Sequence, residues 1–321
     1  MIFENFPIDD AEGCLLAHTL RTPNWVIKKG TRLDTDRIRQ LHNAGIEKVM
    51  AARLVDGDVP EDEAALLIAR KFVSGGVSVK EPQAGRCNLY ADCRGIVIID
   101  RNSIDQFNLL GRGVMVGTVA PFKIVEQGDV VATIKVIPYA VRAPDLEAQQ
   151  AVINNKAIQV QPFKHTRTGL VLTRSAGQKE GLHDKARKIM TDRLESWGGQ
   201  LDRVEKCNHD LDEVAALVSG MGCENYDLIL VMGATSPSDA ADVVPAAIEK
   251  AGGRLEQVGI PVEPGNMMVL GALGTIPVVG LPGCARSQCL NGIDLVLPRL
   301  MAGLPVEAAD LMRLGVGGLL E

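Results

Sequence analysis

The sequence predicts an α/β protein whose C-terminal half is a three-layer domain with helices on both faces of a sheet. Beyond residue 163, apolar runs of strand length alternate with segments of helix length, which is typical of a largely parallel sheet. Two of these runs end in loops of small and hydroxyl residues, at 233–242 and 280–287. Between 86 and 141 the pattern changes to β-branched runs separated by Gly and Pro, which predicts a β-rich region before this domain.

The composition limits the classes of partner. The chain has 321 residues, 46% of them hydrophobic, and a net charge of −6, so it has no broad basic surface for nucleic acid or anionic lipid. No segment approaches the roughly 20 apolar residues of a membrane span, and the N-terminus lacks the pattern of a signal peptide. We therefore expect a cytoplasmic protein with no nucleic-acid or membrane partner. The seven cysteines lack Cys-x-x-Cys spacing, which predicts reduced thiols and no zinc site.

The N-terminal half is predicted in two parts. Residues 1–80 form a mixed α/β segment, and 81–160 form a β-rich region that ends in a helical connector. The expected helices cover 34–45, 61–72 and 144–153, and the expected strands cover 96–99, 114–117 and 130–137.

The α/β domain is placed at 161–305, and 306–321 is left as a C-terminal tail. The order of its elements is predicted from β-branched runs, which are typical of strands, and from glycine pairs, which end helices. The expected strands are 169–173, 201–205, 227–232 and 276–279, and the expected helices are 184–197, 211–219 and a segment that follows Pro245 and ends at 252–253. Because ligands bind at the carboxyl ends of strands in such sheets, both loops are expected to face one ligand.

The loop after the strand 227–232 combines small residues, three hydroxyls and two acids. Backbone N–H groups and hydroxyls suit phosphate, and carboxylates suit Mg²⁺. Pro245 is a poor interior helix residue, so we expect Asp239 and Asp242 to lie in the loop, free to bind a metal. An ordinary turn with two dipole-favoured acids is the competing interpretation.

A basic segment lies near the start of this domain, from 164 to 193. Arg174 and Lys179 lie in a small-residue loop at a strand end and are candidates for contact with an anion. Three further cations are expected on a solvated helix face: Arg187, Lys188 and Arg193. The five histidines show no metal-ligand spacing, and the two in this basic segment, His165 and His183, are read as surface residues.

Three short motifs in order carry a resemblance to a known family. Gly233-Ala-Thr-Ser-Pro-Ser-Asp-Ala-Ala-Asp-Val-Val-Pro245, Pro264-Gly265 and Gly280-Leu-Pro-Gly283 are similar to motifs of the molybdopterin-binding MogA/MoaB and MoeA/gephyrin E-domain families. The whole chain resembles a MoeA-like subgroup sometimes joined to a MocA-type nucleotidyltransferase. The resemblance implies a MogA-like α/β/α fold that binds molybdopterin or adenylyl-molybdopterin across the two loops.

The resemblance also implies site residues and partners. Asp242 and Asp239 are the candidate catalytic and Mg²⁺-binding acids, and molybdate is a candidate substrate. The candidate ligand-binding residues are Gly233, Ala234, Thr235, Ser236, Ser238, Arg174, Lys179, Pro264, Gly265, Asn266, Gly280, Pro282, Gly283, Arg286 and Ser287. We expect a homo-oligomer that acts with a MocA-type nucleotidyltransferase or a molybdoenzyme maturation factor.

The chain departs from the MoeA pattern at several positions. Glu263 and Asn266 stand where the pattern has lysines, and Cys284-Ala285 replaces Asn-Pro. Three activities therefore stay open: a MoeA-like molybdenum insertase with an altered site, a non-catalytic carrier of the cofactor, and a Mg²⁺-dependent nucleotide pyrophosphatase.

Overall fold

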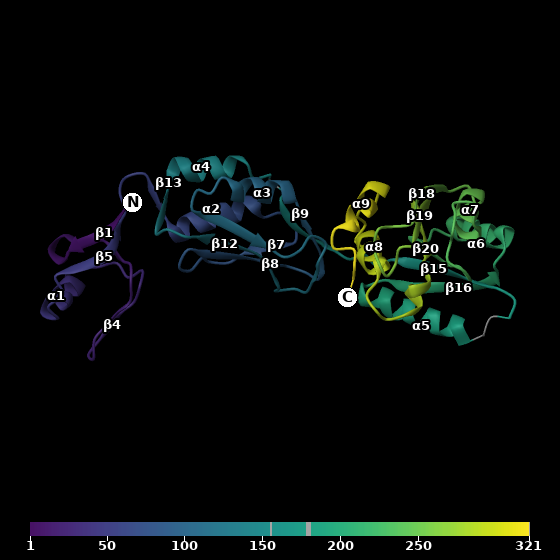
Figure 1. The fold of residues 1–321 in the computed structure, drawn as a ribbon, viewed down its shortest axis with the longest axis horizontal. Coiled ribbons are helices and arrows are strands. Elements are labelled where there is room, and N and C mark those ends of the chain that lie inside the picture. Colours follow the sequence, from purple (N-terminus) through teal and green to yellow (C-terminus); the bar gives the residue numbers. More distant parts are fainter. Residues whose placement is uncertain (155, 178–180, 321) are drawn as a thin grey trace. The chain divides into compact units, whose positions relative to one another are not determined.

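The computed structural model describes residues 1–154, 156–177 and 181–320. The chain divides into two compact units, Met1–Gln161 and Pro162–Glu321 (Figure 1). Within the described residues, no helix has both the length and the apolar character that a membrane crossing requires.

The first part of the N-terminal unit is a small α+β core. Strands β1, β5 and β2 form an antiparallel sheet, and β3 pairs with β4. Helix α1 is capped by Asp34, whose side chain accepts a hydrogen bond from the Arg37 N–H, and Gly45 follows the helix with a φ of 71°. The elements are β1 (Ile2–Pro7), η1 (Ile8–Asp10), β2 (Leu15–Leu16), β3 (Leu20–Arg21), β4 (Val26–Ile27), α1 (Thr35–Asn43) and β5 (Lys48–Arg53).

The second part of this unit packs helix α2, which the sequence analysis placed in the segment 1–80, against a β-rich core. Acids in the first turn of α2 and bases in its last turn match the helix dipole. Phe72 at its end meets Phe107 edge to face at 5.1 Å. The elements are β6 (Asp58–Pro60), α2 (Glu61–Phe72), β7 (Val77–Val79), β8 (Arg86–Ala91), β9 (Gly95–Ile99), α3 (Arg101–Leu109), β10 (Val114–Thr118), β11 (Ile124–Val125), β12 (Val130–Val136), β13 (Ala140–Arg142), α4 (Ala143–Ala151) and β14 (Ile158–Pro162). Their sheets have the orders β10-β12-β8-β7, β11-β9-β14 and β13-β6.

The C-terminal unit is built on a six-stranded sheet with the order β16-β15-β17-β20-β19-β18. The first four strands in this order run parallel, and β19 pairs antiparallel with both β20 and β18. The strands are β15 (Arg167–Arg174), β16 (Gln200–Asn208), β17 (Leu228–Met232), β18 (Arg254–Val258), β19 (Val269–Leu273) and β20 (Ile276–Leu281). All five residues of β17 are buried, as expected for a central parallel strand covered on both faces.

Helices cover both faces of this sheet. Helices α6 (Leu211–Cys223) and α7 (Val243–Lys250) pack on one face, and α5 (Gly181–Ser196) lies on the other (Figure 1). Helix α8 (Gly292–Met301) contacts α5 through an ion pair between Arg193 of α5 and Asp294 of α8. The chain continues through η2 (Gly283–Arg286), which precedes α8, and through α9 (Ala308–Met312) and η3 (Arg313–Gly315) after it. The predicted three-layer α/β fold is confirmed.

Two features of this unit differ from the sequence prediction. The antiparallel strands β18 and β19 were not predicted, because a short amphipathic segment and a segment interrupted by glycine carry weak strand signals. Helix α7 begins at Val243, before Pro245, so the proline lies inside the helix. A first-turn N–H has no partner within the helix, so a proline there removes no hydrogen bond.

Candidate functional site

The carboxyl ends of four parallel strands bring the predicted loops together. Met232 at the end of β17 pairs in register with Leu281 at the end of β20. The loops that follow these residues therefore begin side by side, as the sequence predicts. A Cβ placed on Gly283 would lie 3.4 Å from Ser236 Oγ, so the two loops are in contact.

Arg286 joins these loops, and within the described part of the chain this cation has no acidic partner. Its Nη2 donates to Gly233 O at 2.6 Å, and its Nε is buried with no hydrogen-bond partner among the described residues. Burial lowers the pKa of Arg286. A guanidinium is costly to bury unless it is paired, and it binds phosphate oxygens through two parallel N–H donors. Arg286 thus supplies a positive charge where the two loops meet.

Asp242 is the N-cap of α7, which corrects the prediction that both acids lie free in the loop. Its Oδ1 accepts from Val243 N at 2.8 Å, and its Oδ2 accepts from Ser238 N at 2.9 Å. These backbone hydrogen bonds lower the pKa of Asp242. The error came from placing the helix start at Pro245, since a proline is tolerated in the first turn.

Asp239 also has a local role in this loop. Its Oδ1 accepts from Ala241 N at 2.8 Å, and its backbone carbonyl accepts from Asp242 N. No three His, Cys, Asp or Glu side chains come together as metal ligands within the described ranges. Both carboxylates keep lone pairs that their N–H partners do not use.

His209 belongs to this edge, although the sequence analysis did not name it as a site residue. Its Nδ1 lies 2.8 Å from Thr173 Oγ1 at the end of β15, and its Nε2 lies 3.0 Å from Thr235 Oγ1 in the loop after β17. Thr173 Oγ1 also accepts from Ala234 N at 2.7 Å. The signal was available, because His209 follows a predicted strand and strand ends share one edge of the sheet. His183 is likewise buried, with Nε2 3.1 Å from Thr173 O.

The sequence analysis expected Arg193 on a solvated helix face. Its side chain instead forms hydrogen bonds with the second loop and the residues after it. Its guanidinium donates to Ala285 O and Cys289 O, each at 3.0 Å, and pairs with Asp294 at 2.9 Å. The Arg193 side chain is only 10% exposed. Arg187 and Lys188, on the same helix, are exposed as predicted. Arg193 was misread because helix periodicity alone does not show that α8 packs beside α5.

The Pro264–Gly265 segment packs against the start of α8. Gly292 N donates to Pro264 O at 2.9 Å, and a Cβ on Gly265, whose φ is 127°, would lie 2.4 Å from Gly292 N. Only glycine fits this close backbone approach. The motif residue Pro264 therefore positions backbone, and Asn266 beside it is exposed.

Glu263 lies between this segment and the C-terminal tail. Its N–H donates to Gly318 O and its carbonyl accepts from Leu320 N, so the tail pairs with it as a short parallel bridge. Burial raises the pKa of the Cys284 thiol, and the negative charge of Glu263 raises it further. Glu263 and Cys284 are both departures from the MoeA pattern, and the charge of the first acts on the thiol of the second. All seven cysteines are free, as predicted.

The remaining candidate residues take different places. Arg174 ends β15 with its side chain exposed, whereas Lys179 lies outside the described residues. Gly280 is a strand residue of β20, where a Cβ would lie 2.8 Å from Val269 Cβ. Pro282 is the buried N-cap of η2, and Ser287 Oγ accepts from Cys289 N at 3.2 Å.

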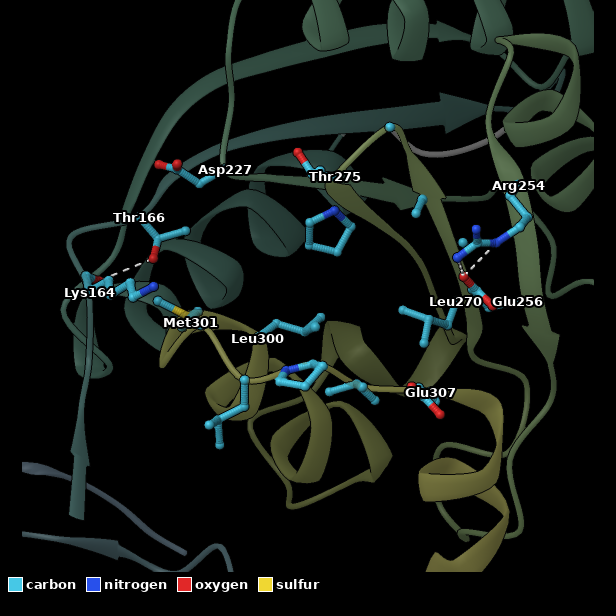
Figure 2. Close-up of a pocket in the computed structure, with 18 of the residues that line it drawn as sticks. Lys164, Thr166, Asp227, Arg254, Glu256, Leu270, Thr275, Leu300, Met301 and Glu307 are labelled. Atoms are coloured by element: carbon cyan, nitrogen blue, oxygen red, sulfur yellow. Dashed lines mark hydrogen bonds and ion pairs between the residues drawn. The ribbon is translucent and has the colours of Figure 1, made fainter. Parts of the chain in front are cut away.

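A pocket of about 570 Å³ lies at the opposite edge of the sheet (Figure 2). Its residues include Thr166, Asp227 and Thr275, which lie at the amino ends of β15, β17 and β20. None of the described candidate residues lines it. Arg254 and Glu256 on its rim form an ion pair, and Asp227 accepts from Arg167 N. These charges are already paired, whereas the described part of the carboxyl edge has a partly buried cation, Arg286, without an acidic partner.

The C-terminal unit, which contains this carboxyl edge, is similar to a known family of domains. Residues 168–302 match a family model described as "Probable molybdopterin binding domain". This stretch contains β15 to β20, both loops and α8, so it includes every candidate residue. No curated protein matches the chain.

Several solved structures are similar to parts of the chain. A molybdopterin biosynthesis protein from Mycobacterium abscessus is 17% identical over 42% of this chain and 92% of its own, with a TM-score of 0.31. The molybdopterin biosynthesis MoeA protein from Pyrococcus horikosii is 17% identical over 94% of this chain and 75% of its own, with a TM-score of 0.34. The molybdopterin biosynthesis enzyme MoaB from Thermus thermophilus is 20% identical over 44% of this chain and 98% of its own, with a TM-score of 0.33. At these TM-scores the likeness supports no inference about activity.

Proposed function

We propose that the carboxyl edge of the C-terminal sheet binds molybdopterin, or its adenylylated form, in molybdenum cofactor biosynthesis. The observation that carries this proposal is Arg286, a partly buried guanidinium at the junction of the two loops that has no acidic partner among the residues described. Its charge fits a phosphate group, and the family match over residues 168–302 makes a pterin the ligand to test. Backbone N–H groups and the hydroxyls of Thr235 and Ser236 would bind the remaining oxygens.

Mg²⁺ fits this site only together with the ligand. Asp242 and Asp239 are two carboxylates in one loop, and Mg²⁺ is commonly held by one or two carboxylates plus phosphate oxygens and water. When bound, the ion would neutralise phosphate charge and favour cleavage of a phosphoanhydride. The protein residues orient the phosphate, with Arg286 on one side and the Asp242 loop on the other.

The binding proposal is tested by what the protein carries out of the cell. The chain is expressed in cells that make molybdopterin, purified, and examined by mass spectrometry for a bound pterin. We expect molybdopterin or adenylyl-molybdopterin at a substantial occupancy. Absence of any pterin, together with no binding of added molybdopterin, would overturn the proposal. A bound nucleotide in its place would favour the pyrophosphatase.

Within this function, the charges near the second loop favour a carrier or a slow insertase. Glu263 supplies a negative charge near Cys284, where a molybdate oxyanion would need a positive one. A charged hydrogen bond contributes about 1.5–3 kcal/mol, against about 1 for a neutral one, so two missing lysines can cost two or more decades in rate.

The Glu263→Lys, Asn266→Lys double variant should therefore insert molybdate faster than the parent protein. Insertion is measured as the molybdenum-containing cofactor formed per unit time from adenylyl-molybdopterin and molybdate. A matched control is Glu256→Lys, Gln257→Lys on β18, which makes the same charge change outside the loops and should leave the rate unchanged. A parent rate equal to that of a MoeA-type enzyme assayed beside it would show that these positions do not limit the chemistry.

A further inference from the structure

Three strand ends at the carboxyl edge are connected through one imidazole. Thr173 Oγ1 lies 2.8 Å from His209 Nδ1, and His209 Nε2 lies 3.0 Å from Thr235 Oγ1. Thr173 is fully buried and also accepts the Ala234 N–H at 2.7 Å. Thr235 is exposed. The chain of contacts therefore runs from the interior of the sheet to a hydroxyl on the surface of the site.

The protons of this chain can be assigned by counting donors and acceptors. A threonine hydroxyl has one proton to donate, and a buried hydroxyl proton needs an acceptor. The Ala234 N–H can only donate, so His209 Nδ1 is the acceptor available to the Thr173 proton among the contacts of Thr173 Oγ1. An imidazole whose Nδ1 accepts carries its proton on Nε2 when neutral. The Nε2–H then donates to Thr235 Oγ1.

We infer that His209 is a neutral, Nε2-protonated positioning residue that makes the Thr235 hydroxyl a hydrogen-bond donor to the ligand. Because Thr235 Oγ1 accepts from His209, its own proton is directed elsewhere, toward the open side of the loop. A hydroxyl held in this way suits an oxygen acceptor, such as a phosphate or carbonyl oxygen. The protonation state follows from the fold alone, and only the identity of the ligand rests on the proposed function.

The acids around His209 accept their hydrogen bonds from groups other than its imidazole. Asp210 caps α6 by accepting from the N–H groups of Asp212 and Glu213. The Glu213 carboxylate accepts from Asn208 N and Asn208 Nδ2. Asp242 has both carboxylate oxygens on backbone N–H groups. The hydrogen bonds of these three described carboxylates thus go to groups other than the imidazole.

The tautomer can be measured on the intact protein without any ligand. The protein is labelled with ¹⁵N at histidine, and the His209 ring signals are identified by their loss in His209→Gln. Near pH 7 we expect an unprotonated Nδ1 and a protonated Nε2 on His209. A proton on Nδ1 of His209, in either the neutral or the cationic ring, would overturn the inference.

The donor role of Thr235 is measured by binding of two probes, molybdopterin and inorganic pyrophosphate. Thr235→Val removes the hydroxyl at nearly constant shape and should weaken binding about tenfold or more, while Thr235→Ser should retain it. His209→Gln, whose amide can accept from Thr173 and donate to Thr235, should bind better than His209→Ala. Adding His209→Ala to Thr235→Val should weaken binding little further, because both act through one hydrogen bond.

The outcomes separate this inference from the proposed function. Additive losses in the double variant, or unchanged binding by Thr235→Val, would overturn the donor role of Thr235. Binding of pyrophosphate without molybdopterin would overturn the proposed function and leave the inference standing. Binding of neither probe would overturn both the proposed function and the role of Thr235 toward a ligand.

Discussion

At the scale of single residues, the site depends on groups that serve structure and ligand together. Arg286 holds the Gly233 carbonyl with one nitrogen and leaves another buried without a partner among the described residues. Asp242 accepts hydrogen bonds from two backbone N–H groups, which shape its loop and lower its pKa. Substitutions at these positions should therefore affect stability and binding to different extents, which makes them separable by measuring both.

Arg286→Gln should weaken molybdopterin binding about tenfold or more, because a charge-assisted hydrogen bond to phosphate contributes about 1.5–3 kcal/mol. Gln can still donate to Gly233 O, so the loop should keep its place. The dissociation constant is measured by titration, with Arg187→Gln on the exposed face of α5 as the matched control. Equal constants for Arg286→Gln and the control would exclude phosphate contact by this guanidinium.

Asp242 should affect both metal-dependent binding and folding. Asp242→Asn should weaken Mg²⁺-dependent binding of adenylyl-molybdopterin more than Asp239→Asn, because Asp242 matches the family motif more directly. Asp242→Ala should also lower the free energy of unfolding by about 1 kcal/mol, the usual contribution of an N-cap side chain. Asp242→Asn should lose less, since an amide oxygen still accepts an N–H.

The pH dependence of this effect has a definite sign. The folded protein lowers the pKa of Asp242 below its ordinary value of 3.8, so the charged carboxylate stabilises the fold at pH above that value. This stabilisation is lost as the pH falls below 3.8 and through the folded pKa. In urea titrations, the stability difference between the parent and Asp242→Asn should therefore shrink from about pH 7 to about pH 3. A difference that grows on acidification would contradict the assignment.

At the scale of elements, the second loop takes its shape from its neighbours. The 3₁₀ turn η2 and the residues up to Asn291 are tied to α5 by Arg193, which contacts Ala285, Cys289 and Asp294. Asn291 begins α8 with a capping box shared with Asp294. Helix α5 thus positions the second loop, although Ala285 in that loop lies 92 residues after Arg193 in the sequence.

Arg193→Met should lower the free energy of unfolding by about 3 kcal/mol, because Asp294 and two carbonyls would lose a largely buried cationic partner. Arg187→Met changes the same residue type on the exposed face of the same helix and should stay within about 0.5 kcal/mol of the parent. Chemical denaturation of both variants gives the comparison. Similar losses in the two would show that the Arg193 contacts add nothing to stability.

At the scale of the whole molecule, the two units have separate hydrophobic cores. All strands of the six-stranded sheet lie between residues 167 and 281, and the residues that pack on α6 and α7 come from the same stretch. The N-terminal unit packs around α2 and around α1. Each core is therefore formed by residues of one unit.

Residues 162–321 expressed alone should fold cooperatively, because they contain a complete sheet with both faces covered. The chain has one tryptophan in each unit, Trp25 and the buried Trp197. In a Trp25→Phe variant of the full chain, Trp197 fluorescence should report the same denaturation midpoint as the isolated fragment. A fragment without a cooperative transition would show that the second unit needs the first.

Several parts of the fold and the site could be predicted from local sequence. Helix α2 has the bounds read from its acids, its apolar face and the glycines that follow it. The strands β15, β17 and β20 were found because buried parallel strands are short apolar runs with sharp ends. The shared position of the two loops then followed from a general property of parallel sheets.

Other features depend on contacts between residues far apart in the chain, which local patterns do not encode. Arg193 reads as a surface residue until α8 packs beside α5, and His209 reads as a lone histidine until β16 lies beside β15. The cap at Asp242 was missed because one proline suggested a later helix start. The sequence by itself therefore determined the order of elements and which loops reach the carboxyl edge, since periodicity and turn residues are local. The tertiary structure alone decided which side chains there are buried, paired or left with an open donor, because burial and hydrogen bonding depend on neighbours that only folding brings together.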